Sequence, residues 1–283
     1  MASMASMTSA KSAILLVSFG TAVKETREKT LDMIEQDLRR AFPSMSLIHA
    51  WTSRILREKV REKEGLMIPD LSDALAELAN DGVRSVYVLP TFVTDGMEYR
   101  QMILDVQAQF DLFETVQIAA PLLGETSEPL SGQNPLLFWE EQIAKPLISA
   151  LIEELPSCPE DELLVFMGHG ASNDNDIHYE QLDHTFQALG YKNIFLKTMK
   201  SSASLDEILE TAKHRQIRRI TLAPFMIAAG GHALKDMSGD NENSWKSRLE
   251  AEGFTVHCHL KGLGEYSGIR RIFISRASQI VSF

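Results

Sequence analysis

An internal repeat restricts the fold of this chain more than any other feature. The two copies are Val86–Tyr99 (VYVLPTFVTDGMEY) and Ile220–Leu234 (ITLAPFMIAAGGHAL). Each copy predicts a buried strand ending at a proline, then a short apolar loop, a glycine and one functional side chain. That side chain is Glu98 in the first copy and His232 in the second, at the same offset of 134 positions (232 − 98) as the preceding prolines and glycines. The chain is therefore expected to contain two copies of one structural unit.

Short apolar runs alternate with amphipathic segments along the rest of the chain. The predicted strands are 12–20, 47–52, 83–89, 116–120, 162–168, 194–198, 217–224 and 255–260. The predicted helices are 26–42, 54–63, 71–79, 101–110, 135–155, 179–189, 205–213, 244–252 and 267–281. Ser72 is the expected N-cap of the third helix, and Pro146 is the expected site of a kink in the long one. Alternating strands and helices predict parallel βαβ units, so the fold class is α/β, with two duplicated Rossmann-like lobes.

The length of the chain agrees with two lobes. A chain of 283 residues exceeds one ordinary domain, and two domains of about 130 residues each match the usual size. Gly124–Asn134, rich in Gly, Ser, Pro and Glu, is the best candidate for a linker. The predicted division is an N-terminal lobe at 12–124 and a C-terminal lobe with a closing helix at 125–283.

Composition excludes several classes of protein. A hydrophobic fraction of 44% and a charged fraction of 24% are typical of globular proteins. The net charge of −11 argues against a nucleic-acid binder, and an anionic ligand would need a local basic patch. No apolar run is long enough to span a membrane, and the start lacks a secretory pattern. The two cysteines, Cys158 and Cys258, are far apart, so we expect a reduced, cytoplasmic protein.

Three side chains mark a candidate site. Glu98, His169 and His232 each follow a predicted strand, and open α/β sheets bind ligands at the carboxyl ends of their strands. His169 lies between two glycines, and His232 follows two. Two such histidines can hold a divalent metal ion or accept protons, and Glu98 can be a third ligand or a general base. The alternative is that each histidine only packs within its turn.

Basic residues at the ends of the equivalent second strands suggest how an acidic protein could bind an anion. They are Arg54 in the first half, and Lys197 and Lys200 in the second. One hypothesis is a clamp for a polycarboxylate. The other is that these are solvated charges at helix starts. No P-loop, HExxH or GxSxG motif is present.

Several stretches resemble one known family, the CbiK-type anaerobic cobaltochelatases of the class II chelatases. They are LLVSFGTAVKETREKT (15–30), AWTSRILREKVREKEG (50–65), LPTFVTDGMEY (89–99), FMGHG (166–170), IAAGGHALKDMSGDNENSWKS (227–247) and GLGEYSGIRRIF (262–273). Together they extend over nearly the whole chain after residue 12.

The resemblance implies two Rossmann-like lobes with a tetrapyrrole cleft between them, and insertion of Co(II) into sirohydrochlorin in anaerobic cobalamin biosynthesis. The paired histidines of the family fall on His169 and His232, which would bind the metal, and its cleft glutamate falls on Glu98. No organic cofactor is implied, since Co(II) is a substrate. The carboxylates of sirohydrochlorin would be bound near Arg54, Phe92, Lys197, Lys200 and Ser201. A homo-oligomer is possible.

One position departs from the family pattern. Family members usually have a metal-binding glutamate after the second strand of the second lobe, where this chain has Lys200. A protonated lysine repels a metal ion, so we predict that Glu98 or water completes the metal site. This departure motivates two alternatives: a related chelatase for iron or nickel, and a tetrapyrrole or metal carrier without catalysis. A two-lobed solute-binding protein is disfavoured by the missing export signal.

Overall fold

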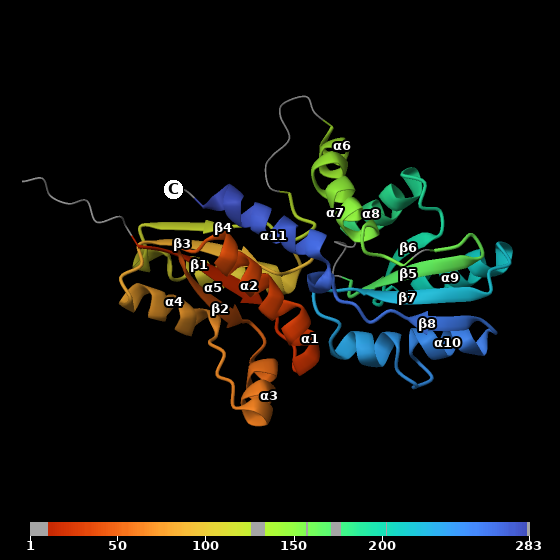
Figure 1. Cartoon of the computed structure of the whole chain (residues 1–283), viewed down its shortest axis with the longest axis horizontal. Coiled ribbons are helices and arrows are strands. Elements are labelled where there is room, and N and C mark those ends of the chain that lie inside the picture. Colours follow the sequence, from red (N-terminus) through yellow and green to blue (C-terminus); the bar gives the residue numbers. More distant parts are fainter. Residues whose placement is uncertain (1–10, 126–133, 157, 171–176, 202, 282–283) are drawn as a thin grey trace, which may run out of the picture.

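Two four-stranded parallel sheets form the framework of the molecule (Figure 1). The computed structural model describes residues 11–125, 134–156, 158–170, 177–201 and 203–281. The strands are β1 (Ser12–Ser18), β2 (Ser46–Trp51), β3 (Ser85–Pro90), β4 (Thr115–Ile118), β5 (Glu162–Gly168), β6 (Ile194–Thr198), β7 (Arg219–Phe225) and β8 (Thr255–Cys258). The sheet orders, β2-β1-β3-β4 and β6-β5-β7-β8, are equivalent. This confirms the predicted α/β fold with two duplicated Rossmann-like lobes.

The register of the central strands reproduces the sequence repeat. Pro90 of β3 pairs with Val17 of β1, and Pro224 of β7 pairs with Met167 of β5. Strands β1 and β5 are apolar and buried on both faces, as expected of parallel strands covered by helices. The two prolines therefore lie at equivalent strand ends, and the loops that follow them leave their sheets at the same edge.

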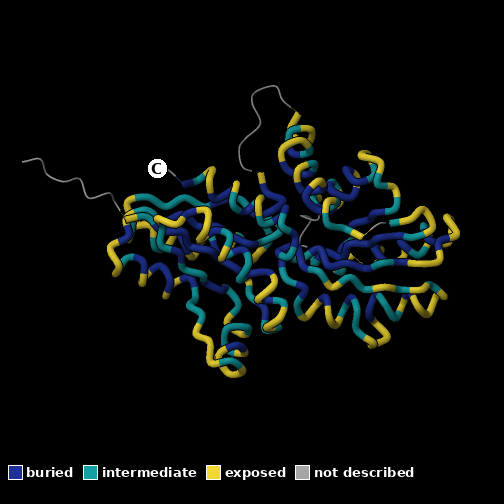
Figure 2. The backbone as a smooth tube through the Cα atoms, viewed as in Figure 1, coloured by how far each residue is buried: buried dark blue, intermediate teal, exposed yellow. Residues whose placement is uncertain are grey.

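Helices cover both faces of each sheet. They are α1 (Lys24–Lys29), α2 (Leu31–Ala41), α3 (Arg54–Glu64), α4 (Leu71–Asn80), α5 (Met97–Gln107), α6 (Pro135–Trp139), α7 (Lys145–Ile152), α8 (Ile177–Ala188), α9 (Ala203–His214), α10 (Trp245–Ala251) and α11 (Ser267–Ile280). Figure 2 shows that burial concentrates in the sheets and at their junction, whereas the outer helices expose one side.

Four details of the helices differ from the sequence predictions. The predicted helix 26–42 is divided at Thr30, whose hydroxyl donates to the carbonyl of Thr26 at 2.6 Å. Asp70, not Ser72, caps α4, because the carboxylate of Asp70 accepts from the Asp73 amide at 2.9 Å. Helix α5 begins at residue 97, so Glu98 lies in its first turn and not in a loop. The long helix 135–155 contains a π-helical segment at 140–144, just before Pro146.

One hydrophobic cluster is shared by both lobes. Ile14 of β1 and Leu164 of β5 both belong to it, together with side chains of α2, α7, α8 and α11. The next residue in each strand points to the opposite face, so Leu15 packs in a cluster of the first lobe and Val165 in one of the second. The inner faces of the two sheets thus bury a common core.

The C-terminal helix crosses from one lobe to the other. Helix α11 contacts α7, and it also contacts α2 and β3 of the first lobe (Figure 1). Arg270 of α11 donates to Asp37 of α2 at 2.7 Å. The predicted division at 124/125, which assigns this helix to the second lobe, stays a prediction, and most of the predicted linker lies outside the described residues. Within those residues, no helix is long and apolar enough to cross a bilayer.

Candidate functional site

A cavity of about 870 Å³ lies between the two lobes. Its wall is built by segments that follow the strands β1, β3, β5 and β7, and by one face of α3. Carboxyl ends of parallel strands from both sheets therefore converge on one space, where the repeat predicted them. Glu98, His169 and His232 all line this cavity, and so do Phe92 and Lys200.

The two histidines form a close pair. Their ring centroids are 5.0 Å apart, and the ring planes are inclined at 68°. His169 Nδ1 lies 3.0 Å from the Gly170 carbonyl oxygen, and His232 Nδ1 lies 2.6 Å from an Asp236 carboxylate oxygen. Because both partners are acceptors, each Nδ1 carries a proton, so Nε2 is the nitrogen that holds the lone pair when the ring is neutral. This is the arrangement of a histidine prepared to bind a metal ion.

Glycines allow the turn that carries His169. Gly170 has φ +79°, a left-handed conformation that side chains rarely adopt. A Cβ atom there would lie 3.1 Å from Thr198 and 3.2 Å from Lys200. At Gly168, a Cβ atom would lie 2.6 Å from the ring of Tyr179. Both glycines are therefore required for close packing around the histidine.

The protonation of His169 depends on its surroundings. Burial is the main cause that lowers the pKa of His169, and the positive charge of Lys200 lowers it further, against the opposing effects of the Gly170 hydrogen bond and Glu98. A neutral imidazole is consequently the dominant form of His169 at neutral pH. Only the neutral form offers a lone pair to a metal ion or to a proton.

Glu98 and His232 occupy equivalent positions, as the repeat indicated. Glu98 lies in the first turn of α5 after Gly96, and His232 precedes the π-helical segment 233–237 after Gly231. Among the described residues, however, no three His, Cys, Asp or Glu side chains lie close enough together to hold a metal ion. Completion of the site by Glu98 or water stays a prediction.

The basic residues of the cavity differ in part from those predicted. Lys200 lines it, but Arg54 and Lys197 do not. Arg54 has an 82% exposed side chain and pairs with Glu58. Lys197 is held between Asp183 at 3.2 Å and Glu207 at 2.8 Å. Ser201 is exposed and also lies outside the wall.

Sequence reasoning missed five charged residues of the wall, which are Lys59, Glu62, Lys63, Lys235 and Asp236. The signal for two of them was available. Lys59 and Lys63 are four residues apart, and so share one face of α3. Asp236 stands four residues after His232, but only the geometry shows that its carboxylate accepts from the imidazole.

Asp236 is expected to orient His232. We predict that Asp236→Asn weakens Co(II) binding by roughly 10- to 100-fold, because the amide no longer offers a charged acceptor to Nδ1. Isothermal titration with Co(II) alone measures this effect. Asp240→Asn is the matched control, since the Asp240 side chain is 94% exposed and pairs with Lys246, not with a histidine. Equal affinities of the Asp236 variant and the wild type would contradict the orienting role.

Comparisons with known proteins show the family to which the sequence is similar. The family model of cobalt chelatase (CbiK) matches residues 12–282. A sirohydrochlorin cobaltochelatase of Salmonella typhimurium is 31% identical over 96% of this chain and 97% of its own. The sirohydrochlorin cobaltochelatase CbiKC of Nitratidesulfovibrio vulgaris is 30% identical over 96% and 91%. These matches confirm the resemblance that the motifs indicated.

Solved structures share the fold at low sequence identity. SirB from Bacillus subtilis with Fe³⁺ is 12% identical and superposes with a TM-score of 0.59 over 95% of both chains. The sirohydrochlorin chelatase SirB from Bacillus subtilis subspecies spizizenii, in complex with cobalt, gives 0.57 over 95% of this chain and 94% of its own. At this identity the likeness establishes the two-lobed fold alone.

Proposed function

The chain belongs to the cobalt chelatase (CbiK) family, and from this premise we propose that it inserts Co(II) into sirohydrochlorin. The observation that carries the proposal is the pair of cavity histidines, whose Nδ1 atoms both lie within hydrogen-bond distance of an acceptor, so that Nε2 is the nitrogen which a neutral ring offers to a metal ion. A cavity of about 870 Å³ between two lobes offers room for a large planar ligand. We further propose that the protein works in the cytoplasm, where cysteines remain reduced.

The proposed metal ligands are His169 and His232. Two imidazoles leave several coordination positions of Co(II) open, so incoming pyrrole nitrogens can replace water. Metallation also removes two pyrrole protons, and a group near the ring must accept them. Glu98, on the wall of the same cavity, is the proposed first acceptor. Phe92, which packs edge-on against Tyr99, is proposed to contact the macrocycle.

Lysines on the wall support a polycarboxylate substrate. Lys59 and Lys63 come from α3 in the first lobe, while Lys200 and Lys235 come from the second. These four cations outnumber the three carboxylates of the wall, Glu62, Glu98 and Asp236. The cavity is thus locally basic in a protein of net charge −11, which favours an anionic ligand there.

The two lysines of α3 provide a direct test of this clamp. We expect Lys59→Gln combined with Lys63→Gln to raise KM for sirohydrochlorin about tenfold and to leave kcat almost unchanged, because exposed charges attract the substrate without touching the reacting atoms. Steady-state kinetics at two salt concentrations measure the change. Arg54→Gln on the same helix is the matched control, and a larger effect of Arg54→Gln would reverse the assignment.

The function itself is tested by the absorption band of sirohydrochlorin after addition of Co(II), at a substrate excess over protein. Multiple turnovers would establish a chelatase, whereas one stoichiometric binding event would indicate a carrier. Parallel reactions with Fe(II) and Ni(II) test the second candidate, a chelatase for another metal. Lys200 lines the cavity, at the position where the resemblance implies a glutamate ligand, and this difference is the reason to test other metals.

A further inference from the structure

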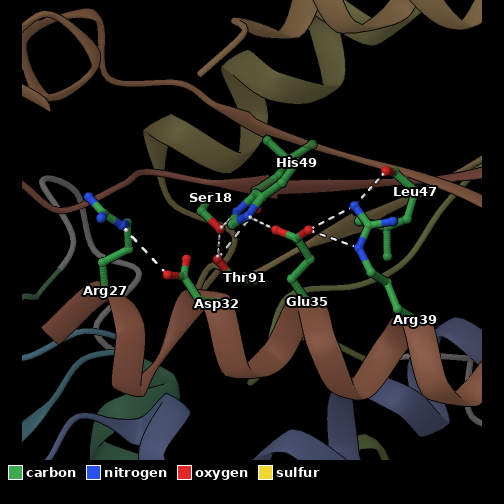
Figure 3. Close-up of polar contacts among 9 residues, drawn as sticks. Ser18, Arg27, Asp32, Glu35, Arg39, Leu47, His49 and Thr91 are labelled. Atoms are coloured by element: carbon green, nitrogen blue, oxygen red, sulfur yellow. Dashed lines mark hydrogen bonds and ion pairs between the residues drawn. The ribbon is translucent and has the colours of Figure 1, made fainter. Parts of the chain in front are cut away.

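A chain of hydrogen bonds runs from the floor of the cavity into the first lobe (Figure 3). Thr91 lines the cavity at the end of β3, and its hydroxyl donates to Ser18 Oγ at 2.8 Å. Ser18 Oγ lies 2.8 Å from His49 Nε2, and His49 Nδ1 lies 3.1 Å from a Glu35 carboxylate oxygen. Thr91 directly follows β3, and the other three side chains come from β1, β2 and α2, so these hydrogen bonds connect the cavity with α2.

The hydrogen bonds of this chain all point in one direction. Burial raises the pKa of Glu35, but hydrogen bonds from His49 and Arg39 outweigh it and hold the pKa below its usual value. Glu35 is therefore an ionised acceptor, and His49 Nδ1 must carry the proton that it donates. In a neutral His49 ring, Nε2 accepts from the Ser18 hydroxyl, and Ser18 Oγ in turn accepts from Thr91. Each donor faces away from the cavity.

The two ends of the chain differ in their access to solvent. Thr91 and Ser18 are 4% and 1% exposed, and the His49 side chain is 10% exposed. Glu35 is 25% exposed and bonds to Arg39, which is 51% exposed. The inner members are thus shielded from bulk water, and only the last one reaches it.

A serine, a histidine and a carboxylate in this order also suggest a nucleophile. The geometry does not support that function, because Ser18 is almost fully buried and its oxygen is covered by the Thr91 hydroxyl. A purely structural role is the other alternative. It explains why the buried polar atoms are paired, but not why an uninterrupted chain begins on the wall of the cavity.

We propose that Thr91, Ser18, His49 and Glu35 form a proton-transfer chain that carries pyrrole protons from the cavity to solvent at the partly exposed carboxylate of Glu35. The proposal rests on the proposed function, since metallation releases two protons beside this wall. A bound macrocycle would cover the cavity and restrict the exchange of its water. A route through the floor then remains open while the mouth is occupied.

The transfer is balanced at each step. A proton from the cavity binds Thr91 Oγ1 as the Thr91 hydroxyl proton moves to Ser18, and the Ser18 proton moves to His49 Nε2. His49 is then an imidazolium beside the Glu35 carboxylate. Its Nδ1 proton passes to Glu35 and from there to water. One proton has left the cavity, and rotation of the hydroxyls and return of the imidazole to its first tautomer restore the chain.

Thr91→Val and Thr91→Ser form the deciding pair of variants. We expect Thr91→Val to lower kcat for cobalt insertion about tenfold, with KM unchanged and a larger ratio of rates in H₂O and D₂O, because a methyl group cannot relay a proton. Thr91→Ser keeps the hydroxyl and should stay within about twofold of wild type. Thr185→Val, which removes a buried hydroxyl that donates to the Gln181 carbonyl of its own helix, is the control for structural cost.

Ser18→Ala interrupts the same proton-transfer chain one step later, and it tests the proposal if Thr91→Val fails to fold. Its expected effects equal those of Thr91→Val. The double variant should be no slower than either single variant, because both substitutions interrupt the same proton-transfer chain. A wild-type kcat in these variants, or an equal loss of kcat in Thr185→Val, would overturn the proposed proton-transfer chain and leave the proposed function standing. A wild-type protein that binds sirohydrochlorin without metallating it would overturn the proposed function and the chain together.

Discussion

Replacing His169 with alanine is expected to lower kcat/KM for cobalt insertion by roughly 10²- to 10⁴-fold. The imidazole is the half-buried member of the histidine pair, and its Nε2 lone pair is available because Nδ1 bonds to the Gly170 carbonyl. Alanine leaves His232 as the single imidazole of the pair. One ligand cannot hold Co(II) at a defined place against the macrocycle, so both metal binding and its orientation are lost.

Loss of the stopped-flow metallation signal, with sirohydrochlorin binding retained, is the expected outcome for His169→Ala. His257→Ala serves as the matched control, because His257 is an exposed histidine on β8, outside the cavity wall. A His169→Ala protein that metallates at the wild-type rate would remove this histidine from the mechanism. His232→Ala would then need to account for the whole activity.

The fold was predictable because strand burial and helix periodicity are local signals. Each predicted strand has a counterpart in the structure, and the two sheets have the same order because the repeat encodes the same unit twice. The break at Thr30 was not predictable in this way. Thr30 packs closely against Gly264, where a Cβ atom would lie 2.9 Å from the threonine Cβ, and such a contact is distant in sequence.

For the candidate site, the sequence could predict only which side chains lie at the ends of strands. On α3, Arg54 was chosen because it follows a strand, but Lys59 lies roughly 140° around the helix from Arg54 and faces the cavity with Lys63. Lys197 was chosen for its charge, yet Asp183 on α8 binds it. Facing directions and partners from other elements depend on packing, which sequence periodicity does not report.

The second large effect concerns stability and involves Arg276 on α11. This side chain is 3% exposed, and it donates to the backbone oxygens of Ala120 at 3.4 Å, Leu122 at 2.9 Å and Gly124 at 3.2 Å. Burial lowers the pKa of Arg276 to about 10, so the group is still charged at neutral pH. One buried cation thus satisfies three carbonyl groups of the segment after β4.

We expect Arg276→Met to lower the free energy of unfolding by about 3 kcal/mol or more, because three carbonyl groups lose their charged donor while the methionine side chain conserves most of the volume. Urea denaturation followed by circular dichroism measures this change. Arg271→Met on the same helix is the control. Arg271 is 62% exposed and pairs with Glu153, so its loss should cost no more than about 0.5 kcal/mol.

The effect of Arg276 should extend to the cavity wall. The amides of Leu122 and Leu123 donate to the carbonyls of Phe92 and Val93, and both of these residues line the cavity. Releasing the segment from α11 therefore loosens the wall that faces the histidine pair. A variant that is destabilised but keeps the wild-type KM for sirohydrochlorin would show that the wall holds its shape without this link. A higher KM well below the unfolding temperature is the result that we expect, since this link joins α11 to the part of the cavity wall that the first lobe contributes.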